Sequence, residues 1–244
     1  MVNPRPEQEA LQNGYFLDLV LGSEDVEAFL TDLAAFSAES LSNPGPVFCG
    51  ITVLRRKRAA TAASSDDRAR LMDELQNTNE GPCLTAMDEL TPVLVPDLLR
   101  EDRWPEYVEA AANQGLRSIL SVPLLVEGDT RAALNLYSER PNAFTEGDVE
   151  RAEVFASHAA KSLRLALKIA QLSDARNDLQ AAMQSRTIID LAVGAIMAQN
   201  HCSQEEAFTI LRTASSNRNI KLRHLAQSII AAVSSGKVTT HFEE

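Results

Sequence analysis

The stretch from Leu179 to Val233 constrains the fold most, because its apolar residues repeat with helical period and two clear breaks divide it into three helices. In the first helix, apolar side chains recur at spacings of three and four residues: Ile188, Leu191, Ala192, Ala195 and Ile196. Such spacing forms one apolar face, and we expect this helix to end near Asn200. Three short amphipathic helices with short connections can bury these faces against one another, so the stretch predicts a compact bundle.

The second and third helices carry recognisable start and stop signals. Ser203-Gln-Glu-Glu206 has the form of a capping box, in which serine and glutamate each bond the other's backbone amide. The helix that follows should end around Ser216-Asn217, because asparagine tolerates the left-handed conformation that closes helices. Its predicted buried stripe is Ala207, Phe208, Ile210, Leu211 and Ala214. The third helix should start at Leu222 and run to Val233, with Gly236 as its stop.

Together these motifs resemble one known module. They are Arg186 with the pair Ile188-Ile189, then Ala192-Val-Gly-Ala-Ile-Met197, then Ser203-Gln-Glu-Glu-Ala-Phe-Thr-Ile-Leu-Arg212, then the run from Leu222 to Ile230. The pattern is similar to the ANTAR domain, an RNA-binding module of bacterial transcription antitermination regulators. The resemblance implies a three-helix bundle that holds paired RNA hairpin loops and prevents a terminator from forming. Val193 departs from the pattern, since many family members have lysine there.

The charge distribution limits where a nucleic acid could bind. The 244-residue chain carries a formal net charge of −11, which taken whole argues against nucleic acid. Residues 179–237, however, hold six basic and three acidic side chains, whereas residues 1–178 hold 17 basic and 29 acidic ones. We therefore expect any nucleic acid at the C-terminal end of the chain.

Composition excludes several other classes. Cys49, Cys83 and Cys202 lie far apart without a C-x-x-C pair, which fits reduced thiols in a cytoplasmic protein rather than a disulfide framework or a zinc site. The four histidines show no paired spacing on one helix, so we expect no metal site. No apolar run is long enough for a membrane span, and the N-terminus lacks a signal-peptide pattern, so we expect no membrane association.

The N-terminal two-thirds of the chain mixes helices and strands. Residues 1–23 form a polar arm that is either disordered or packed on the next domain, and Asp25 to Leu41 has helical period. Strands are expected over Val47–Leu54, Arg58–Ser64, Pro92–Val95, Ser118–Val126 and Arg131–Tyr137. The last two flank Glu127-Gly-Asp-Thr130, which suits a hairpin turn.

Further helices are expected among these strands, over Asp66–Gln76, over Trp104–Ala112 and from the capping box Thr145-Glu-Gly-Asp148 onward. This order predicts an α+β fold with an antiparallel sheet. From about Asp25 to Ala170 it resembles a GAF domain, through Gly81-Pro-Cys83, Val95-Pro-Asp97 with Asp102-Arg-Trp-Pro105, and Ser121-Val-Pro-Leu124. The resemblance implies about six strands with helices on both sides, and a sensory rather than catalytic role.

The segment between the two modules is expected to be helical, within a helix that can run from Asp148 to about Ala198. Five apolar residues fall at heptad a and d positions: Leu165, Ile169, Leu172, Leu179 and Met183. Arg176 and Arg186 interrupt one position each. This pattern favours a homodimer through the linker, and the alternative is a long helix lying on its own domain.

Two sets of candidate site residues follow. For RNA they are Arg186, Asp190, Gly194, Arg212, Asn217, Arg218, Asn219, Lys221 and Arg223, which lie off the apolar stripes. Arginine guanidinium groups would stack on unpaired bases there and asparagine amides would read base edges. The alternative is an ordinary solvated face. For a small-molecule ligand of the GAF domain they are Cys83, Trp104 and Ser121, and each has a packing role as its alternative.

The expected organisation is an arm over 1–23, a GAF sensory domain over 24–170, a helical linker over 171–187, an ANTAR domain over 188–236 and a tail over 237–244. An antitermination regulator that binds RNA hairpin loops is the first functional hypothesis, with no cofactor beyond an unidentified GAF ligand. A DNA-binding regulator is the alternative, although no helix carries a cluster of base-reading side chains near its N-terminus. A sulfoxide reductase working through cysteines is disfavoured, because Cys49 and Cys83 show no resolving arrangement.

Overall fold

A computed structural model of the chain describes residues 6–42, 45–55, 62–76, 80–126 and 130–233. The chain divides into two compact units, residues 1–170 and 171–244. The α-helices of the first unit are α1 (Pro6–Gly22), α2 (Val26–Leu41), α3 (Asp67–Gln76), α4 (Pro82–Glu89), α5 (Pro105–Asn113) and the start of α6 (Glu146–Asn200). Its strands are β1 (Phe48–Arg55), β2 (Ala62–Ser64), β3 (Val93–Val95), β4 (Ser118–Leu124) and β5 (Thr130–Ser138), and a short 3-10 helix spans Leu98–Arg100.

The five strands form one antiparallel sheet in the order β2-β1-β5-β4-β3. Each strand that the residue pattern predicts is present at least in part. Residues 58–61 and 127–129, which include the ends of the two expected hairpins, lie outside the described residues. The resemblance implied about six strands, and the described part of the chain has five. The expected α+β class is confirmed.

Local chemistry explains where the helices begin. The Asp25 side chain accepts a hydrogen bond from the Ala28 amide at 2.8 Å and caps α2. Pro82 and Pro105 open α4 and α5, where a missing N–H costs nothing. At the start of α6, Asp148 accepts from the Thr145 amide at 2.8 Å, which confirms the predicted capping box with aspartate in the glutamate position.

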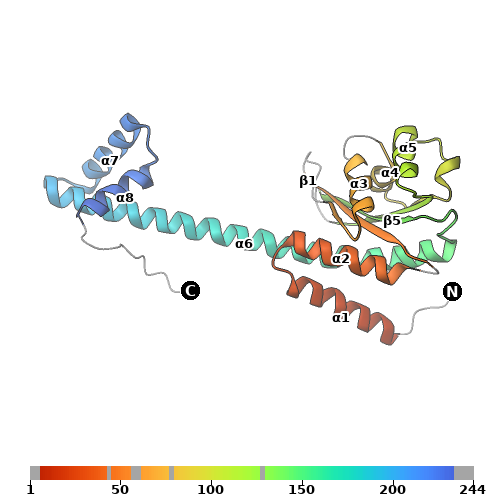
Figure 1. The fold of residues 1–244 in the computed structure, drawn as a ribbon. Helices are drawn as coiled ribbons and strands as arrows, with labels where there is room; N and C mark the ends of the chain where they lie inside the picture. The colour runs from red at the N-terminus through yellow and green to blue at the C-terminus, as the bar shows by residue number, and fades with distance from the viewer. Residues whose placement is uncertain (1–5, 43–44, 56–61, 77–79, 127–129, 234–244) are drawn as a thin grey trace. The chain divides into compact units, whose positions relative to one another are not determined.

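Helices cover both faces of the sheet (Figure 1). On one face α2 packs on β1 and β2, and buried residues of α1, α2 and α6 share a core with the sheet. On the other face α3 packs on β1 and β2, and α4 packs on β3, β4 and β5. A second core there combines Met72 of α3, Tyr107 of α5 and Tyr137 of β5. The sheet is therefore covered on both sides, and β4 and β5 are buried along almost their whole length.

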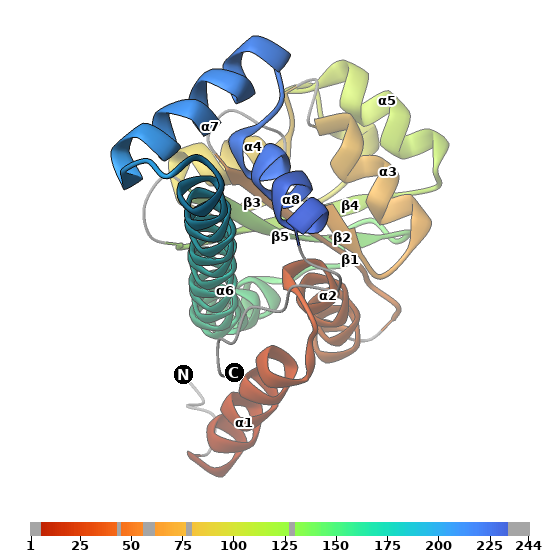
Figure 2. The ribbon, with the colours of Figure 1, turned by 90° about the vertical axis from the view of Figure 1, so that its left-hand side faces the viewer.

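The polar arm expected over residues 1–23 contains a helix that packs on the domain. Helix α1 lies beside α2 (Figure 2). Phe16 is 2% exposed and its ring lies 5.5 Å from that of Phe36 and 5.1 Å from that of Phe155. These edge-to-face contacts join three helices. The apolar patch within the arm therefore belongs to the core.

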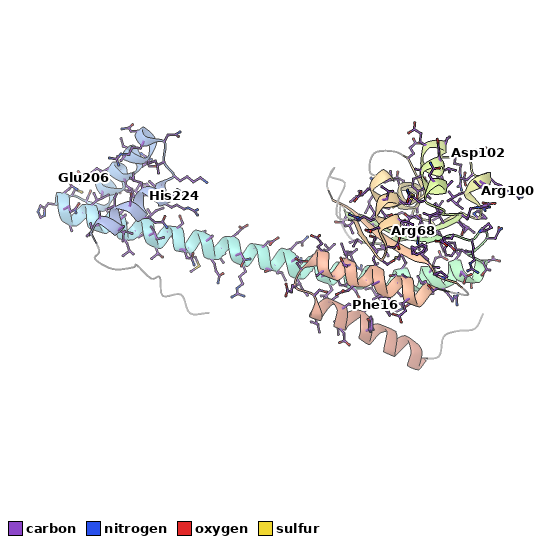
Figure 3. The ribbon with its side chains drawn as sticks, viewed as in Figure 1. Phe16, Arg68, Arg100, Asp102, Glu206 and His224 are labelled. Carbon is purple, nitrogen blue, oxygen red and sulfur yellow. The ribbon has the colours of Figure 1, made fainter. Side chains whose placement is uncertain are left out.

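In the second unit, the C-terminal part of α6 is followed by α7 (Gln204–Arg218) and α8 (Leu222–Val233). Ser203 and Glu206 form the predicted capping box, in which Glu206 accepts from the Ser203 amide at 2.9 Å and Ser203 Oγ accepts from the Glu206 amide at 3.3 Å. Glu206 is labelled in Figure 3. The predicted end of α7 was one to two residues early, because the helix runs to Arg218 and Asn219 rather than Asn217 takes the left-handed conformation, at φ 51°. Gly236 lies outside the described residues.

The core of the second unit is small. Ala192, Ala207 and Ala226, one from each helix, are fully buried, and a few larger residues such as Ile196 and Leu211 pack around them. Alanines at these positions let the three helices approach closely. No helix in the described part of the chain is both long and apolar enough to traverse a membrane.

Candidate functional sites

The basic side chains of the second unit lie on α7, on the turn after it and on the start of α8. Arg212, Arg218, Lys221 and Arg223 are all exposed. No carboxylate among the described residues forms an ion pair with any of them. Four unpaired cations within twelve residues make a surface that can attract phosphate groups.

Positions around α7 divide the candidates further. Successive residues of a helix are about 100° apart, so Arg212 lies about 40° from Phe208 but about 140° from Asn217. Asn217 is therefore exposed on a different side of the helix from Arg212. The backbone of Asn219 closes α7, because its N–H donates a hydrogen bond to the Ser216 carbonyl at 3.1 Å. Its side chain is exposed.

The candidates on α6 are also exposed. Arg186 and Asp190 form an ion pair with 3.8 Å between Nε and Oδ2, and their side chains are 86% and 61% exposed. Such a solvated pair contributes little to stability and can exchange for an external partner. A Cβ atom built on Gly194 would meet nothing within 4 Å. Close packing against another helix of the described chain therefore does not explain the glycine.

Three predictions about burial in this unit were wrong. Leu191, Phe208 and Ile210 were expected in the core, but they are 47%, 39% and 46% exposed. The alanine-rich centre of the bundle is too narrow to cover the full width of each apolar stripe. Val193, by contrast, is 4% exposed and belongs to the core. Phe208 is thus an accessible aromatic ring, one helical turn before Arg212.

The three ligand-pocket candidates all lie on the sheet face that α3, α4 and α5 cover. Cys83 and Ser121 are fully buried, and Trp104 is 7% exposed. Ser121 on β4 lies directly opposite Asn135 on β5. Trp104 packs in the core of that face, with the Arg103 guanidinium 4.4 Å from its ring centre. The predicted residues therefore share one face of the sheet. Burial there raises the pKa of the Cys83 thiol to about 12.

At the centre of this face lies a residue that sequence reasoning missed. Asp73 of α3 is fully buried, and its Oδ1 accepts from Tyr137 Oη at 2.6 Å and from Asn135 Nδ2 at 2.8 Å. Burial raises its pKa to about 7, although both hydrogen bonds act in the opposite direction. The available signal was weak, since one aspartate in an amphipathic helix normally faces water.

The sheet beneath Asp73 is shaped to receive it. Gly50 on β1 lies under the carboxylate, and a Cβ atom at that position would come within 1.8 Å of Asp73 Oδ2. Gly50 and Ser121 are the two cross-strand neighbours of Asn135, one on each side. Asp73 Oδ2, Asn135 Oδ1 and Ser121 Oγ have no hydrogen-bond partner among the described residues. We call Asp73, Asn135 and Ser121 the acceptor row.

Comparisons with protein-family models identify both units. A GAF domain model matches residues 23–164, and an ANTAR domain model matches residues 177–230. The first match covers more than half of the chain. A search of curated proteins found no match.

Solved structures with a similar fold come from several bacteria. A GAF domain/HD domain protein from Geobacter sulfurreducens is 17% identical, with a TM-score of 0.46, over 61% of this chain and 97% of that one. The N-acylhomoserine lactone dependent LuxR family transcription factor CepR2 from Burkholderia cenocepacia is 16% identical, with a TM-score of 0.49, over 65% and 96%. A free methionine-R-sulfoxide reductase from Neisseria meningitidis is 18% identical, with a TM-score of 0.46, over 69% and 96%.

Proposed function

Because the chain belongs to the GAF domain family and carries an ANTAR domain after the GAF domain, we propose that it is an RNA-binding transcription antitermination regulator. In this proposal the ANTAR domain holds RNA hairpin loops and prevents a terminator from forming, and the GAF domain controls it. The observation that carries the proposal is the ANTAR match together with the unpaired basic side chains on α7 and α8. The expected boundaries, including a linker over 171–187, are part of the proposal. The site of action is the cytoplasm, where transcripts are made.

The proposed RNA surface is centred on Arg212 and Phe208. The exposed ring supplies a flat surface on which an unpaired loop base can stack, and the guanidinium one turn away can contact a phosphate or a base edge. The proposed surface continues through Arg218, Lys221 and Arg223, which can contact further phosphates of the RNA. The remaining candidates on this side are Asn217 and Asn219, and on α6 Arg186, Asp190 and Gly194.

A salt series on RNA binding tests this surface. A labelled pair of RNA hairpins is titrated with the wild-type chain and with Arg212→Ala and Arg218→Ala, and duplex DNA of equal length tests the alternative of a DNA-binding regulator. Loss of one phosphate contact should weaken binding and reduce the salt slope by about one. Arg100→Ala removes an exposed arginine of the GAF domain (Figure 3) and serves as the control of equal charge.

The outcomes separate the alternatives. If both variants are folded and bind the hairpin pair with unchanged affinity across the salt series, the RNA site lies elsewhere. Stronger binding to duplex DNA than to the hairpin pair would favour the DNA-binding alternative.

We further propose that the regulator is a homodimer through α6. The five apolar heptad residues of this helix are 41–62% exposed: Leu165, Ile169, Leu172, Leu179 and Met183. A line of large apolar side chains on an exposed helix is costly in water, and pairing with the same face of a second copy would bury it. Two copies would also present two RNA sites for a pair of hairpins.

Light scattering tests the dimer. Replacing Leu172 and Leu179 by glutamate introduces charge into the paired face and should give a monomer. Glutamate at two nearby exposed positions on the outer side of the helix, Asn177 and Ala181, is the matched control and should leave the dimer intact. A dimer that persists in the first variant would move the interface away from this segment.

The proposed role is regulatory rather than enzymatic. Cys49 and Cys83 are both fully buried, and they belong to cores on opposite faces of the sheet. Burial holds the pKa of each thiol well above its ordinary value, so neither is a thiolate near neutral pH. A thiol-dependent methionine sulfoxide assay should therefore give no turnover.

A further inference from the structure

The acceptor row is an unusual feature for the interior of a protein. Its three unpartnered oxygen atoms, Asp73 Oδ2, Asn135 Oδ1 and Ser121 Oγ, belong to side chains with no exposed surface. Folded proteins pair nearly all their buried polar atoms, because an unpaired one loses its bonds to water and receives nothing in return. Three such atoms can accept hydrogen bonds from a bound group.

The sheet register brings the three groups together. Asn135 lies directly opposite Gly50 on one side and Ser121 on the other, so the three positions form one row across β1, β5 and β4. Side chains at such positions point to the same face, with Cβ atoms about 5 Å apart. The Asp73 carboxylate fills the space above Gly50, and Asn135 donates to it at 2.8 Å. A carboxylate, an amide oxygen and a hydroxyl oxygen therefore follow one another along the row.

The chemistry of these atoms defines what they can bind. When Asp73 is ionised, all three atoms can accept a hydrogen bond, and only the serine hydroxyl can also donate one. One of them carries a negative charge when ionised. Tyr137 and Asn135 both donate to the other oxygen of Asp73, which holds the carboxylate in place. The complementary group has several N–H donors and a positive charge.

A metal ion fits the row poorly. Calcium takes six to eight oxygen ligands and magnesium six, commonly from several carboxylates, and Asp73 is the one carboxylate of the row. No group of three or more metal-ligating side chains occurs among the described residues. A bound water molecule would satisfy the oxygens without any signalling role, and the test below separates it from a ligand.

We propose that the acceptor row binds a compact organic cation with N–H donors, such as a primary ammonium or guanidinium group. Asp73 supplies the opposite charge, and Asn135 and Ser121 accept the remaining hydrogen bonds. The proposal names the ligand class of the GAF domain, so it rests on the sensory role proposed above.

Protonation of Asp73 should oppose this binding. The groups near it, Tyr137, Tyr107 and Cys83 on its own face of the sheet and Cys49 on the other face, all have a raised pKa and stay neutral near pH 7. Glu74, its neighbour on α3, is exposed. With a pKa of about 7, Asp73 is largely protonated at pH 6 and largely ionised at pH 8. A cation that binds the ionised form should therefore bind about tenfold more tightly at pH 8 than at pH 6, with release of a proton.

The experiment is calorimetric titration of the full chain with methylguanidinium chloride and with methylammonium chloride, at pH 6 and pH 8. Tetramethylammonium chloride has the same charge but no N–H donor. Buffers with different ionisation enthalpies count the released proton. Asp73→Asn should abolish binding, and Ser121→Ala should weaken it, which gives a second variant should the first not fold. Asp67→Asn removes an exposed carboxylate from the same helix and is the matched control.

The supporting result is saturable binding of one N–H probe per chain that tightens with pH and is lost in Asp73→Asn. Retention of binding in that variant, equal binding of tetramethylammonium, or no saturable binding of either N–H probe would overturn the proposal. The last result would assign the row to bound water. RNA-hairpin binding is measured on the same samples. If it is intact when the probes fail, the regulator proposal stands, whereas loss of hairpin binding in the folded wild-type chain refutes that proposal separately.

Discussion

Replacing Asp73 by asparagine should remove a pH dependence from the stability of the GAF domain. The pKa of Asp73 is raised from 3.8 to about 7 in the folded chain, chiefly by burial. The folded state therefore holds this proton more tightly than the unfolded state does. Protonated Asp73 stabilises the fold at low pH, and that contribution is lost as the pH rises toward 7.

The magnitude follows from the two pKa values. Between pH 5 and pH 8.5, a single group with pKa values of 3.8 unfolded and about 7 folded should lower the free energy of unfolding by about 3 kcal/mol. Asparagine has nearly the same shape and does not titrate in this range. Groups elsewhere in the chain titrate equally in both proteins, so the difference between wild type and Asp73→Asn isolates Asp73.

Trp104 makes the measurement specific. It is the chain's one tryptophan and lies in the core beside α3, so its fluorescence reports unfolding of the GAF domain in the full chain. In urea titrations at pH 5 and pH 8.5, the free energy of unfolding of the wild type should fall by about 3 kcal/mol relative to that of Asp73→Asn. Asp67→Asn should keep the wild-type dependence. Parallel behaviour of wild type and Asp73→Asn across this range would refute the reasoning, since Asp73 would then titrate alike in both states.

Three further substitutions test other features. Gly50→Ala places an ideal Cβ atom 1.8 Å from Asp73 Oδ2, so it should lower the free energy of unfolding in urea by about 1–3 kcal/mol and disrupt the acceptor row. The matched control Gly147→Ala, whose Cβ would meet no atom closer than 3.9 Å, should not destabilise the chain. Gly194→Ala should raise the stability of the ANTAR domain by up to about 1 kcal/mol, because the site is helical and open; a fall in RNA affinity alongside that gain, measured by hairpin titration, would show that RNA approaches the glycine, and unchanged affinity would remove Gly194 from the site. Ser203→Ala removes the capping box of α7 and should lower the melting temperature of the ANTAR domain by an amount corresponding to about 1 kcal/mol; no change would mean that water replaces the cap.

Patterns within a few residues predicted most of the secondary structure. The capping boxes at Thr145 and Ser203 formed as expected, because both partners lie within one helical turn. The strands β1, β4 and β5 were recognisable for the same local reason, since each is a β-rich run and β4 and β5 flank a turn sequence. The end of α7 was misplaced because either Asn217 or Asn219 can adopt the left-handed conformation, and contacts beyond the helix decide between them.

Burial was less predictable than secondary structure. A helical stripe shows which side of a helix faces the core, but the width that the core covers depends on the size of the neighbouring helices. Phe208 and Leu191 sit near the edge of their stripes, and close packing around Ala192 and Ala207 leaves them partly in water. Alanine at a helix crossing narrows the core. The sequence of one helix does not show which residue of another helix packs against that alanine.

The sequence alone determined the two modules, their order, the α+β class and the basic C-terminal surface, since each depends on local periodicity, on short motifs or on charge counts. Only the tertiary structure placed Asp73 over Gly50 and beside Asn135, because residues 23 and 62 positions away in the chain meet it through the register of β1 and β5. The raised pKa of Asp73 has the same origin. It comes chiefly from the burial of Asp73 between α3 and the sheet, and this burial arises only when the helix and the sheet are packed together.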